Sequence, residues 1–146
     1  MKRLHPKTHA GFTLIEILLV IIIIIGLMAV LIPNIRNAMT SSRSSTAEIY
    51  VNRIAGSVAR YELTNGRPPS TEQGLAALIQ KPSGEPVPRR WSQIEEKIEL
   101  DPWSEPYHYE FPGRHNTKSF DVFSAGPDRQ AGTEDDIGNW ESPQSK

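Results

Sequence analysis

The feature that most constrains this chain is an apolar run near its N-terminus. Residues 14–32 include one charged side chain, Glu16, and no other polar side chain. As a helix rising about 1.5 Å per residue, the run is roughly 28 Å long, enough to cross the hydrocarbon core of a bilayer. A basic segment precedes it, and such a flank keeps the N-terminus of a first span in the cytoplasm. The sequence therefore predicts a single transmembrane segment over 12–33, followed by an exported domain.

Two simpler interpretations of this N-terminus compete. A secretory signal that is removed whole has an apolar region of about 7–15 residues and a small-x-small cleavage site, whereas this run is longer and no Ala-x-Ala follows it. A plain, uncleaved signal anchor explains the run and its basic flank but neither Glu16 nor Gly11. A carboxylate at mid-membrane costs at least about 2.5 kcal/mol, so it needs a purpose and a partner. On the pattern alone, the plain anchor stays open.

The residues at the start of the apolar run form a motif that resembles one known from a protein family. Residues 11–16 read Gly-Phe-Thr-Leu-Ile-Glu, which resembles the processing motif of type IV pilins and type II secretion pseudopilins. The resemblance implies that a prepilin peptidase removes the basic leader 1–11 by cutting between Gly11 and Phe12, and that it methylates the new N-terminus. It also implies that the apolar helix 12–33 later forms the core of a filament.

Cleavage at that position also offers a partner for the buried carboxylate. The cut creates an α-ammonium group on Phe12, and Glu16 lies four residues on, on the same face of a helix. We therefore predict that Glu16 pairs with its own amine or with that of a neighbouring subunit. In a low dielectric such a pair would couple assembly to processing.

Composition excludes several classes of function. The chain has 146 residues and a net charge of −1, which becomes −4 without the three cations of the leader. This argues against a nucleic-acid surface, which requires a basic patch. The absence of cysteine excludes disulfides and thiolate metal sites. The four histidines are scattered, and no nucleophile or phosphate-binding motif occurs, so no enzyme is predicted.

The second part of the stem is predicted from helical periodicity. Between residues 34 and 64 apolar residues recur at spacings of four and three, which is typical of an amphipathic helix: Ala47, Val51, Ile54, Val58 and Tyr61. Gly66 supplies a left-handed cap and the prolines at 68–69 end the helix. Together with the apolar run this makes one stem of about 50 residues. Pro33 marks a stretch where the stem could loosen.

The rest of the chain predicts short elements. Ser70 and Gln73 have the spacing of a capping box and begin a helix whose inward-facing residues are Leu75, Leu78 and Ile79. A short helix is also predicted over 91–100. Alternation over 107–111 and the apolar stretch 120–123 predict an antiparallel hairpin that packs on the stem.

Three segments extend the resemblance over nearly the whole mature chain. Residues 65–75, 101–107 and 136–140 resemble the major pseudopilins of type II secretion. The fold class that this implies is α+β and type IV pilin-like. It has a long N-terminal stem helix, with a transmembrane and an amphipathic half, packed on a small antiparallel sheet. The domain exported to the periplasm covers 34–146.

This chain departs from the pattern of the major pseudopilins at three places. Ser104 and Glu105 stand where Gly-Asn is common, and Arg129 stands where a glycine is usual. Residues 89–100 lack the glycine-rich, tyrosine-containing pattern of the family.

One loop near the C-terminus contains side chains that could bind a metal ion. Residues 124–140 combine glycines with several carboxylates, and calcium takes six to eight oxygens in flexible loops. The spacing does not match an EF-hand, and on composition alone a solvated acidic turn stays open. The resemblance implies a structural calcium ion with the side-chain ligands Asp128, Asp135 and Asp136. Carbonyls near 124–125 and 129–131 would complete the shell, Glu134 is left outside it, and Ile137 and Trp140 cover the loop.

The function implied is that of a structural subunit. Processed copies would polymerise into a periplasmic pseudopilus that helps drive folded proteins out through the outer membrane. The implied partners are further copies, minor pseudopilins, the prepilin peptidase and the inner-membrane assembly platform. The precursor would span the inner membrane once, with its N-terminus in the cytoplasm.

Two alternatives remain from the sequence. One is a type IV pilus subunit or a minor pseudopilin, although pilins usually carry a C-terminal disulfide and this chain has no cysteine. The other is a membrane-tethered periplasmic calcium-binding module or enzyme.

Overall fold

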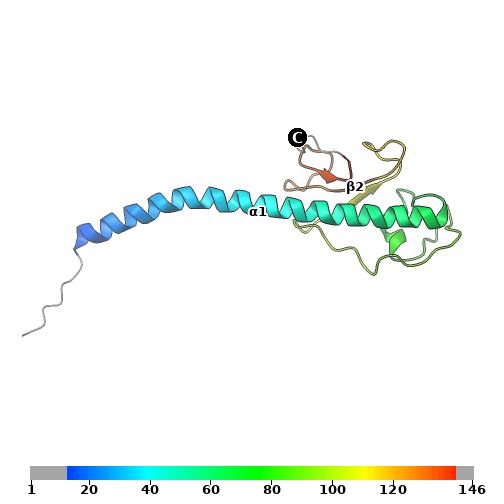
Figure 1. Ribbon diagram of the computed structural model, residues 1–146, viewed down its shortest axis with the longest axis horizontal. Helices are drawn as coiled ribbons and strands as arrows, with labels where there is room; N and C mark the ends of the chain where they lie inside the picture. Colours follow the sequence, from blue (N-terminus) through cyan, green and yellow to red (C-terminus); the bar gives the residue numbers. More distant parts are fainter. Residues whose placement is uncertain (1–12, 141–146) are drawn as a thin grey trace, which may run out of the picture. The chain divides into compact units, whose positions relative to one another are not determined.

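The computed structural model describes residues 13–140, with the backbone alone at positions 30, 33, 34, 36 and 37. Its dominant element is helix α1, which runs over Leu14–Asn65 (52 residues; Figure 1). The predicted stem of about 50 residues is confirmed. The helix is continuous through position 33, so the predicted loosening does not appear as a break. The chain forms two compact units, Met1–Met39 and Thr40–Lys146.

The first unit contains the apolar half of α1. The helix begins with a side-chain cap, because the Glu16 backbone N–H donates to Thr13 Oγ1 at 3.3 Å. The large apolar side chains that are described along 14–32 are exposed, from 45% at Val20 to 86% at Leu14. Among the residues described, which begin one position inside the predicted segment 12–33, no helix is long and apolar enough to cross a membrane.

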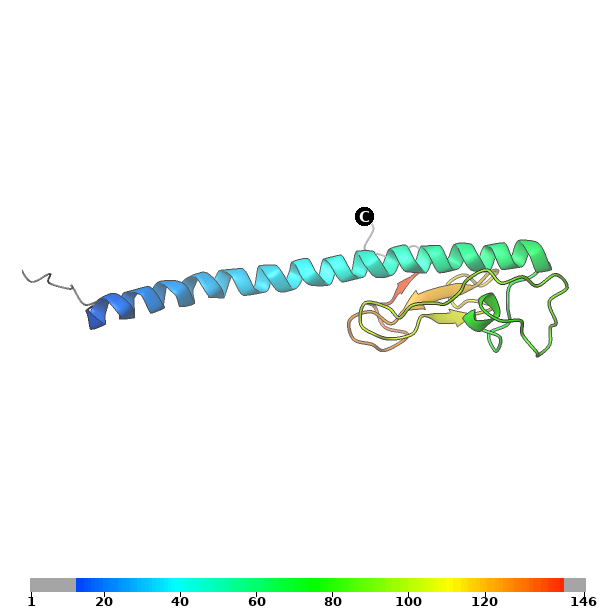
Figure 2. The same ribbon diagram turned by 90° about the horizontal axis from the view of Figure 1, so that it is seen from below.

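The second unit places the rest of α1 against a small sheet (Figure 2). The elements are the 3-10 helix η1 (Leu75–Leu78) and the strands β1 (His108–Glu110), β2 (Asp121–Ser124) and β3 (Ile137–Gly138). The strand order is β1-β2-β3, and both pairs are antiparallel. The predicted hairpin is confirmed by the β1–β2 register, in which His108 faces Phe123. Strand β3 was not predicted.

The core of this unit forms between the helix and the sheet. All five residues of the predicted stripe are buried, each at most 2% exposed: Ala47, Val51, Ile54, Val58 and Tyr61. Four of them, Val51, Ile54, Val58 and Tyr61, pack in one cluster with Leu78 of η1 and with side chains of the sheet region, among them Tyr109, Phe120 and Val122. At about 25 cal/mol per Å² of apolar surface, this burial is what holds the helix to the sheet. The α+β class is confirmed.

The turn after α1 follows its glycine and its capping box. Gly66 has a φ of +81°, and its N–H donates to the Glu62 carbonyl, as expected for a left-handed cap. Ser70 and Gln73 exchange hydrogen bonds of 3.1 and 3.2 Å between backbone N–H groups and side-chain oxygens. The predicted α-helix is nevertheless only a turn followed by η1. Gly74, with a φ of +56°, interrupts the helical backbone before it is established.

The helix predicted over 91–100 is wrong, since this segment is irregular. Its backbone is held by tertiary contacts: the N–H groups of Ile94 and Glu95 both donate to the Leu78 carbonyl, at 2.9 and 3.1 Å. Ile94 and Ile98 still face the core, as half-buried side chains. Inward-facing apolar residues at a spacing of four therefore do not require a helix here.

Glu95 fixes this segment to α1. Its carboxylate accepts hydrogen bonds from Arg53 at 2.7 Å and Ser57 at 2.6 Å. Burial by itself would raise the pKa of Glu95, but the hydrogen bonds from Ser57 and Arg53, together with the Arg53 charge, hold it below its usual value.

Candidate metal site

The three aspartates predicted as ligands lie in the loop that joins β2 to β3. Its ends are fixed by the antiparallel pairs Phe123–Gly138 and Ser124–Ile137. The Trp140 ring lies over Gly138, where an added Cβ would come within 2.2 Å of it, and stacks on His115 with centroids 3.8 Å apart. The expected cover by Ile137 and Trp140 is therefore partial, because both residues are only half-buried.

A glycine brings the two sides of this loop together. Gly126 has a φ of +66°, and a Cβ built on it would lie 2.2 Å from the Asp135 carbonyl oxygen. Only glycine accommodates both the left-handed backbone and this close approach. The backbone of Asp135 is thereby held against the end of β2.

Two residues without glycine's freedom also have a positive φ: Ser104 at 70° and Arg129 at 59°. These are two of the positions where the chain departs from the glycine expected of a major pseudopilin. A left-handed backbone costs a residue with a Cβ about 1–2 kcal/mol. Ser104 and Arg129 therefore each strain the backbone locally.

Ser104→Gly and Arg129→Gly should each stabilise the protein, by about 0.5–1 kcal/mol, because they relieve that strain. The measurement is the midpoint of urea unfolding at constant slope. The matched control is Ser83→Gly, at an exposed loop position outside the left-handed region, which should be neutral or slightly destabilising. A loss of stability in both test variants would contradict the strain argument.

Asp128 and Asp135 are linked through the backbone of the loop. The Asp128 N–H donates to Asp135 Oδ2 at 3.1 Å, and Thr133 Oγ1 donates to Asp135 Oδ1 at 2.6 Å. The Thr133 hydroxyl, with lesser help from the Asp128 N–H, lowers the pKa of Asp135. Asp128 Oδ1 accepts the Gln130 N–H at 2.8 Å. Both carboxylates are thus partly satisfied within the loop.

Asp136 is different, because it is buried and only half satisfied. Its Oδ2 accepts the Gly132 N–H at 2.7 Å, but its Oδ1 is buried with no hydrogen-bond partner. Burial raises the pKa of Asp136, and the charges of Asp135 and Asp128 raise it further, against the Gly132 hydrogen bond. A buried acceptor without a donor costs about 1–3 kcal/mol, and either a proton on this carboxylate or a nearby cation would relieve that cost.

The donor chemistry of the loop fits a hard cation such as calcium, since it supplies carboxylate and carbonyl oxygens and no nitrogen or sulfur. The orphaned Asp136 Oδ1 supports the fit. However, within residues 13–140 no three His, Cys, Asp or Glu side chains are grouped so that they could hold a metal ion. The structure therefore brings the three aspartates into one loop but not into one ligand cluster, and the calcium site stays a prediction.

Asp121 is a structural residue that the sequence analysis did not identify. Its side chain is 1% exposed and accepts the backbone N–H groups of His115 at 2.8 Å and Asn116 at 3.0 Å. Burial by itself would raise the pKa of Asp121, but these hydrogen bonds and the His115 charge hold it below its usual value. A polar residue at the start of an apolar strand is the signal that could have indicated it.

Two further polar side chains anchor the loop. Asn139 accepts the Val122 N–H at 2.9 Å and donates to the Phe120 carbonyl at 3.1 Å, which ties the chain after β3 to β2. Asp101 accepts a short hydrogen bond from Ser124 Oγ and also binds the backbone at 103–105. These contacts place the start and the end of the loop on the same scaffold.

The residues predicted for processing and assembly lie apart from this loop. Gly11 and Phe12 are outside the described residues. Glu16 is exposed in the first turn of α1. Its predicted pairing with the Phe12 amine therefore stays a prediction.

Comparisons with known proteins were made for the whole chain. Residues 34–140 match the family model described as type II secretion system (T2SS), protein G. A type II secretion system core protein G from Pseudomonas aeruginosa is 38% identical over 95% of this chain and 100% of its own length. The protein of the same name from Dickeya chrysanthemi is 40% identical over 92% of this chain and 88% of its own.

Among solved structures, one match is the crystal structure of the major pseudopilin from the type 2 secretion system of enterohaemorrhagic Escherichia coli. Its TM-score is 0.67 at 36% identity, and the match covers 74% of this chain and 95% of that one.

Proposed function

The chain belongs to the core protein G family of the type II secretion system, the major pseudopilins, and we propose from this how its parts serve a pseudopilus. As a member of this family it is a structural subunit of the pseudopilus. The observation that carries this conclusion is the family match over 34–140, which spans the second half of α1 and the whole sheet. We assign the chain no catalytic role.

Assembly would use the apolar half of α1. The large apolar side chains that are described along 14–32 are exposed, and contiguous apolar surface of this extent marks an interaction surface. We propose that residues 12–33 hold the precursor in the inner membrane and then pack with other copies in the filament core. Removal of the leader 1–11 by a prepilin peptidase, with methylation of Phe12, would precede this transfer.

The remaining partners follow from the same role. The periplasmic pseudopilus would contain minor pseudopilins besides this subunit and would grow from an inner-membrane assembly platform. Its growth would help to drive folded proteins out through the outer membrane. In the subunit, a calcium ion held by Asp128, Asp135 and Asp136 would give the β2–β3 loop one shape.

The test is to isolate periplasmic or surface filaments from cells that express the secretion system. This chain should be their bulk component, and mass spectrometry should find Phe12 as the first residue. In the same cells Glu16→Val should be inserted and cut normally, because removal of a carboxylate eases insertion, but it should assemble poorly. Filaments without this chain would contradict the proposed function, whereas wild-type yield from Glu16→Val would contradict only the ion pair.

A further inference from the structure

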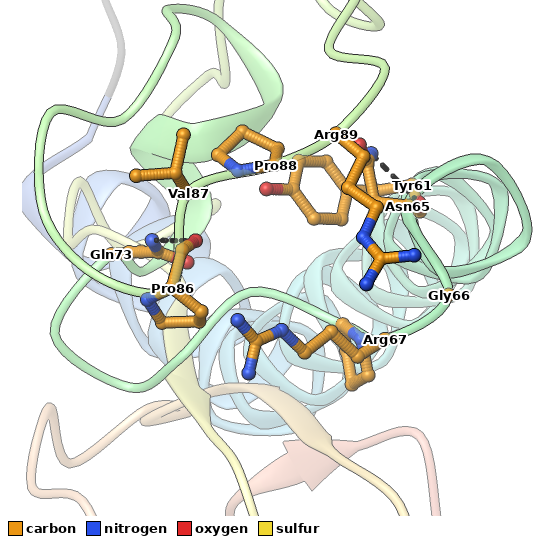
Figure 3. Close-up of a pocket in the computed structure, with 10 residues that line it drawn as sticks. Tyr61, Asn65, Gly66, Arg67, Gln73, Pro86, Val87, Pro88 and Arg89 are labelled. Atoms are coloured by element: carbon orange, nitrogen blue, oxygen red, sulfur yellow. Dashed lines mark hydrogen bonds between the residues drawn. The ribbon is translucent and has the colours of Figure 1, made fainter.

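A cavity of about 440 Å³ lies at the end of α1 in the second unit (Figure 3). Its lining comes from the last turn of the helix, from the turn after it and from the loop that follows η1. Three of its lining residues are prolines: Pro68, Pro86 and Pro88. The loop is also fixed to the turn, because Gln73 Nε2 donates to the carbonyls of Gly84 and Pro86 at 3.1 and 3.0 Å. The cavity is thus built from restrained backbone.

Two arginines give this cavity its chemistry. Arg67 and Arg89 both line it, and Figure 3 shows their side chains on two different sides of the opening, each from a different segment. The Arg89 segment is held on the helix end, since the Arg90 N–H donates to Asn65 Oδ1 at 3.1 Å. Within the described residues neither arginine forms an ion pair, and no carboxylate lines the cavity. Planar guanidinium groups recognise carboxylates through paired, charge-assisted hydrogen bonds.

A carboxylate whose charge is opposite to that of the two arginines lies at the other end of the same unit. Glu134 is exposed in the β2–β3 loop and has no hydrogen-bond or ion-pair partner among residues 13–140. It lines a cavity together with Thr40 and Ser44, at the start of the unit's part of α1. From there to the last turn at 61–65 is about twenty residues, or roughly 30 Å of helix. One end of the unit therefore offers a free carboxylate, and the other offers two free guanidinium groups.

We propose that Glu134 of one copy docks between Arg67 and Arg89 of another copy in the pseudopilus. The inference rests on the proposed function, because it needs many copies in one polymer. A contact between two different patches of the same chain generates an open helical filament when its rotation does not close into a ring, as a pseudopilus requires. We choose Glu134 as the group that enters the cavity because its negative charge complements the two arginines. This contact would give Glu134 a role separate from metal binding.

Charge exchange tests the contact in cells that assemble filaments. Arg89→Glu and Glu134→Arg should each lower filament yield several-fold, and the combined variant should recover part of that loss, because the exchange restores the contact at position 89 while Arg67 stays in place. The matched controls are Arg60→Glu and Glu96→Arg, which are exposed, lie outside the cavity and should leave the yield unchanged. Equal steady-state levels of all variants show that folding is not the cause.

Cross-linking gives a second readout that does not depend on yield. The chain has no cysteine, so Arg89→Cys and Glu134→Cys can be introduced into separate, co-expressed copies. A short bis-maleimide should join the two kinds of copy in filaments, whereas Arg60→Cys with Glu134→Cys should not react.

The outcomes separate this contact from the proposed function. If Glu134→Arg assembles normally, or if the exchanged pair is not rescued and no cross-link forms, the contact is wrong and the filament role stands. Defects in the arginine variants alone would assign the cavity to another anionic partner and would likewise overturn the contact. If wild-type chains form no filaments, the proposed function fails and the contact fails with it.

Discussion

Asp136→Asn should raise the stability of the calcium-free protein and lower it when calcium is present. In chelator the wild-type side chain is a buried carboxylate with one unpartnered oxygen, beside the charges of Asp135 and Asp128. Its pKa is raised in the folded state, so its contribution to stability is present at low pH and is lost as pH rises through that pKa. At neutral pH the ionised form therefore destabilises the fold, and a neutral amide at this position relieves that cost.

In calcium, the wild-type protein should be more stable than Asp136→Asn, the reverse of their order in chelator. A ligand that binds only the folded state adds about 2.7 kcal/mol at a hundredfold excess over its Kd, or roughly 10 °C in Tm for a domain of this size. Asp136→Asn should lose most of that gain. The measurement is thermal melting of the processed chain in detergent, in calcium and in chelator, with Glu134→Gln as a control that behaves as wild type. Identical wild-type curves in the two buffers would remove the metal and leave a solvated acidic loop.

Asp121→Ala should be the most damaging single change in the sheet, with a loss of about 3 kcal/mol in the free energy of unfolding. The change leaves the N–H groups of His115 and Asn116 without their acceptor, and an unmade hydrogen bond of a buried group costs about 1–3 kcal/mol, less where the group is part-buried as these are. Because the pKa of Asp121 is lowered, its contribution is present at neutral pH and is lost as pH falls through the folded-state value.

Urea unfolding at pH 7 and at pH 3 would measure this contribution. The difference between wild type and Asp121→Ala should shrink at the lower pH, and Asp121→Asn should be intermediate, since an amide keeps one acceptor oxygen. A loss below about 1 kcal/mol at pH 7 would show that solvent replaces the carboxylate. The hydrogen bonds of Asp121 would then not hold the turn at 113–116 to β2.

The sequence by itself determined the elements that depend on local periodicity and on special residues. The stripe from Ala47 to Tyr61 predicted which face of α1 is buried, and every member of it is. Gly66 ends the helix with a positive φ, as its lack of a side chain permits. Alternation located the β1–β2 hairpin to within about one residue at each end. In each case the signal and its cause lie within a few neighbouring residues.

Only the tertiary structure decided the rest. Residues 91–100 have a helical spacing of apolar residues but are irregular, because their backbone and one side chain bind other segments. Two of their backbone N–H groups donate to the Leu78 carbonyl, and the Glu95 carboxylate accepts hydrogen bonds from Arg53 and Ser57. Strand β3 has two residues, too few for any period, and exists because Asn139 and the pairing with β2 hold it there. Within residues 13–140, one oxygen of Asp136 has no hydrogen-bond partner and the guanidinium groups of Arg67 and Arg89 form no ion pair, and neither fact can be read from the sequence. Burial and hydrogen-bond satisfaction are set by groups distant in the chain, so they are defined only once the chain has folded.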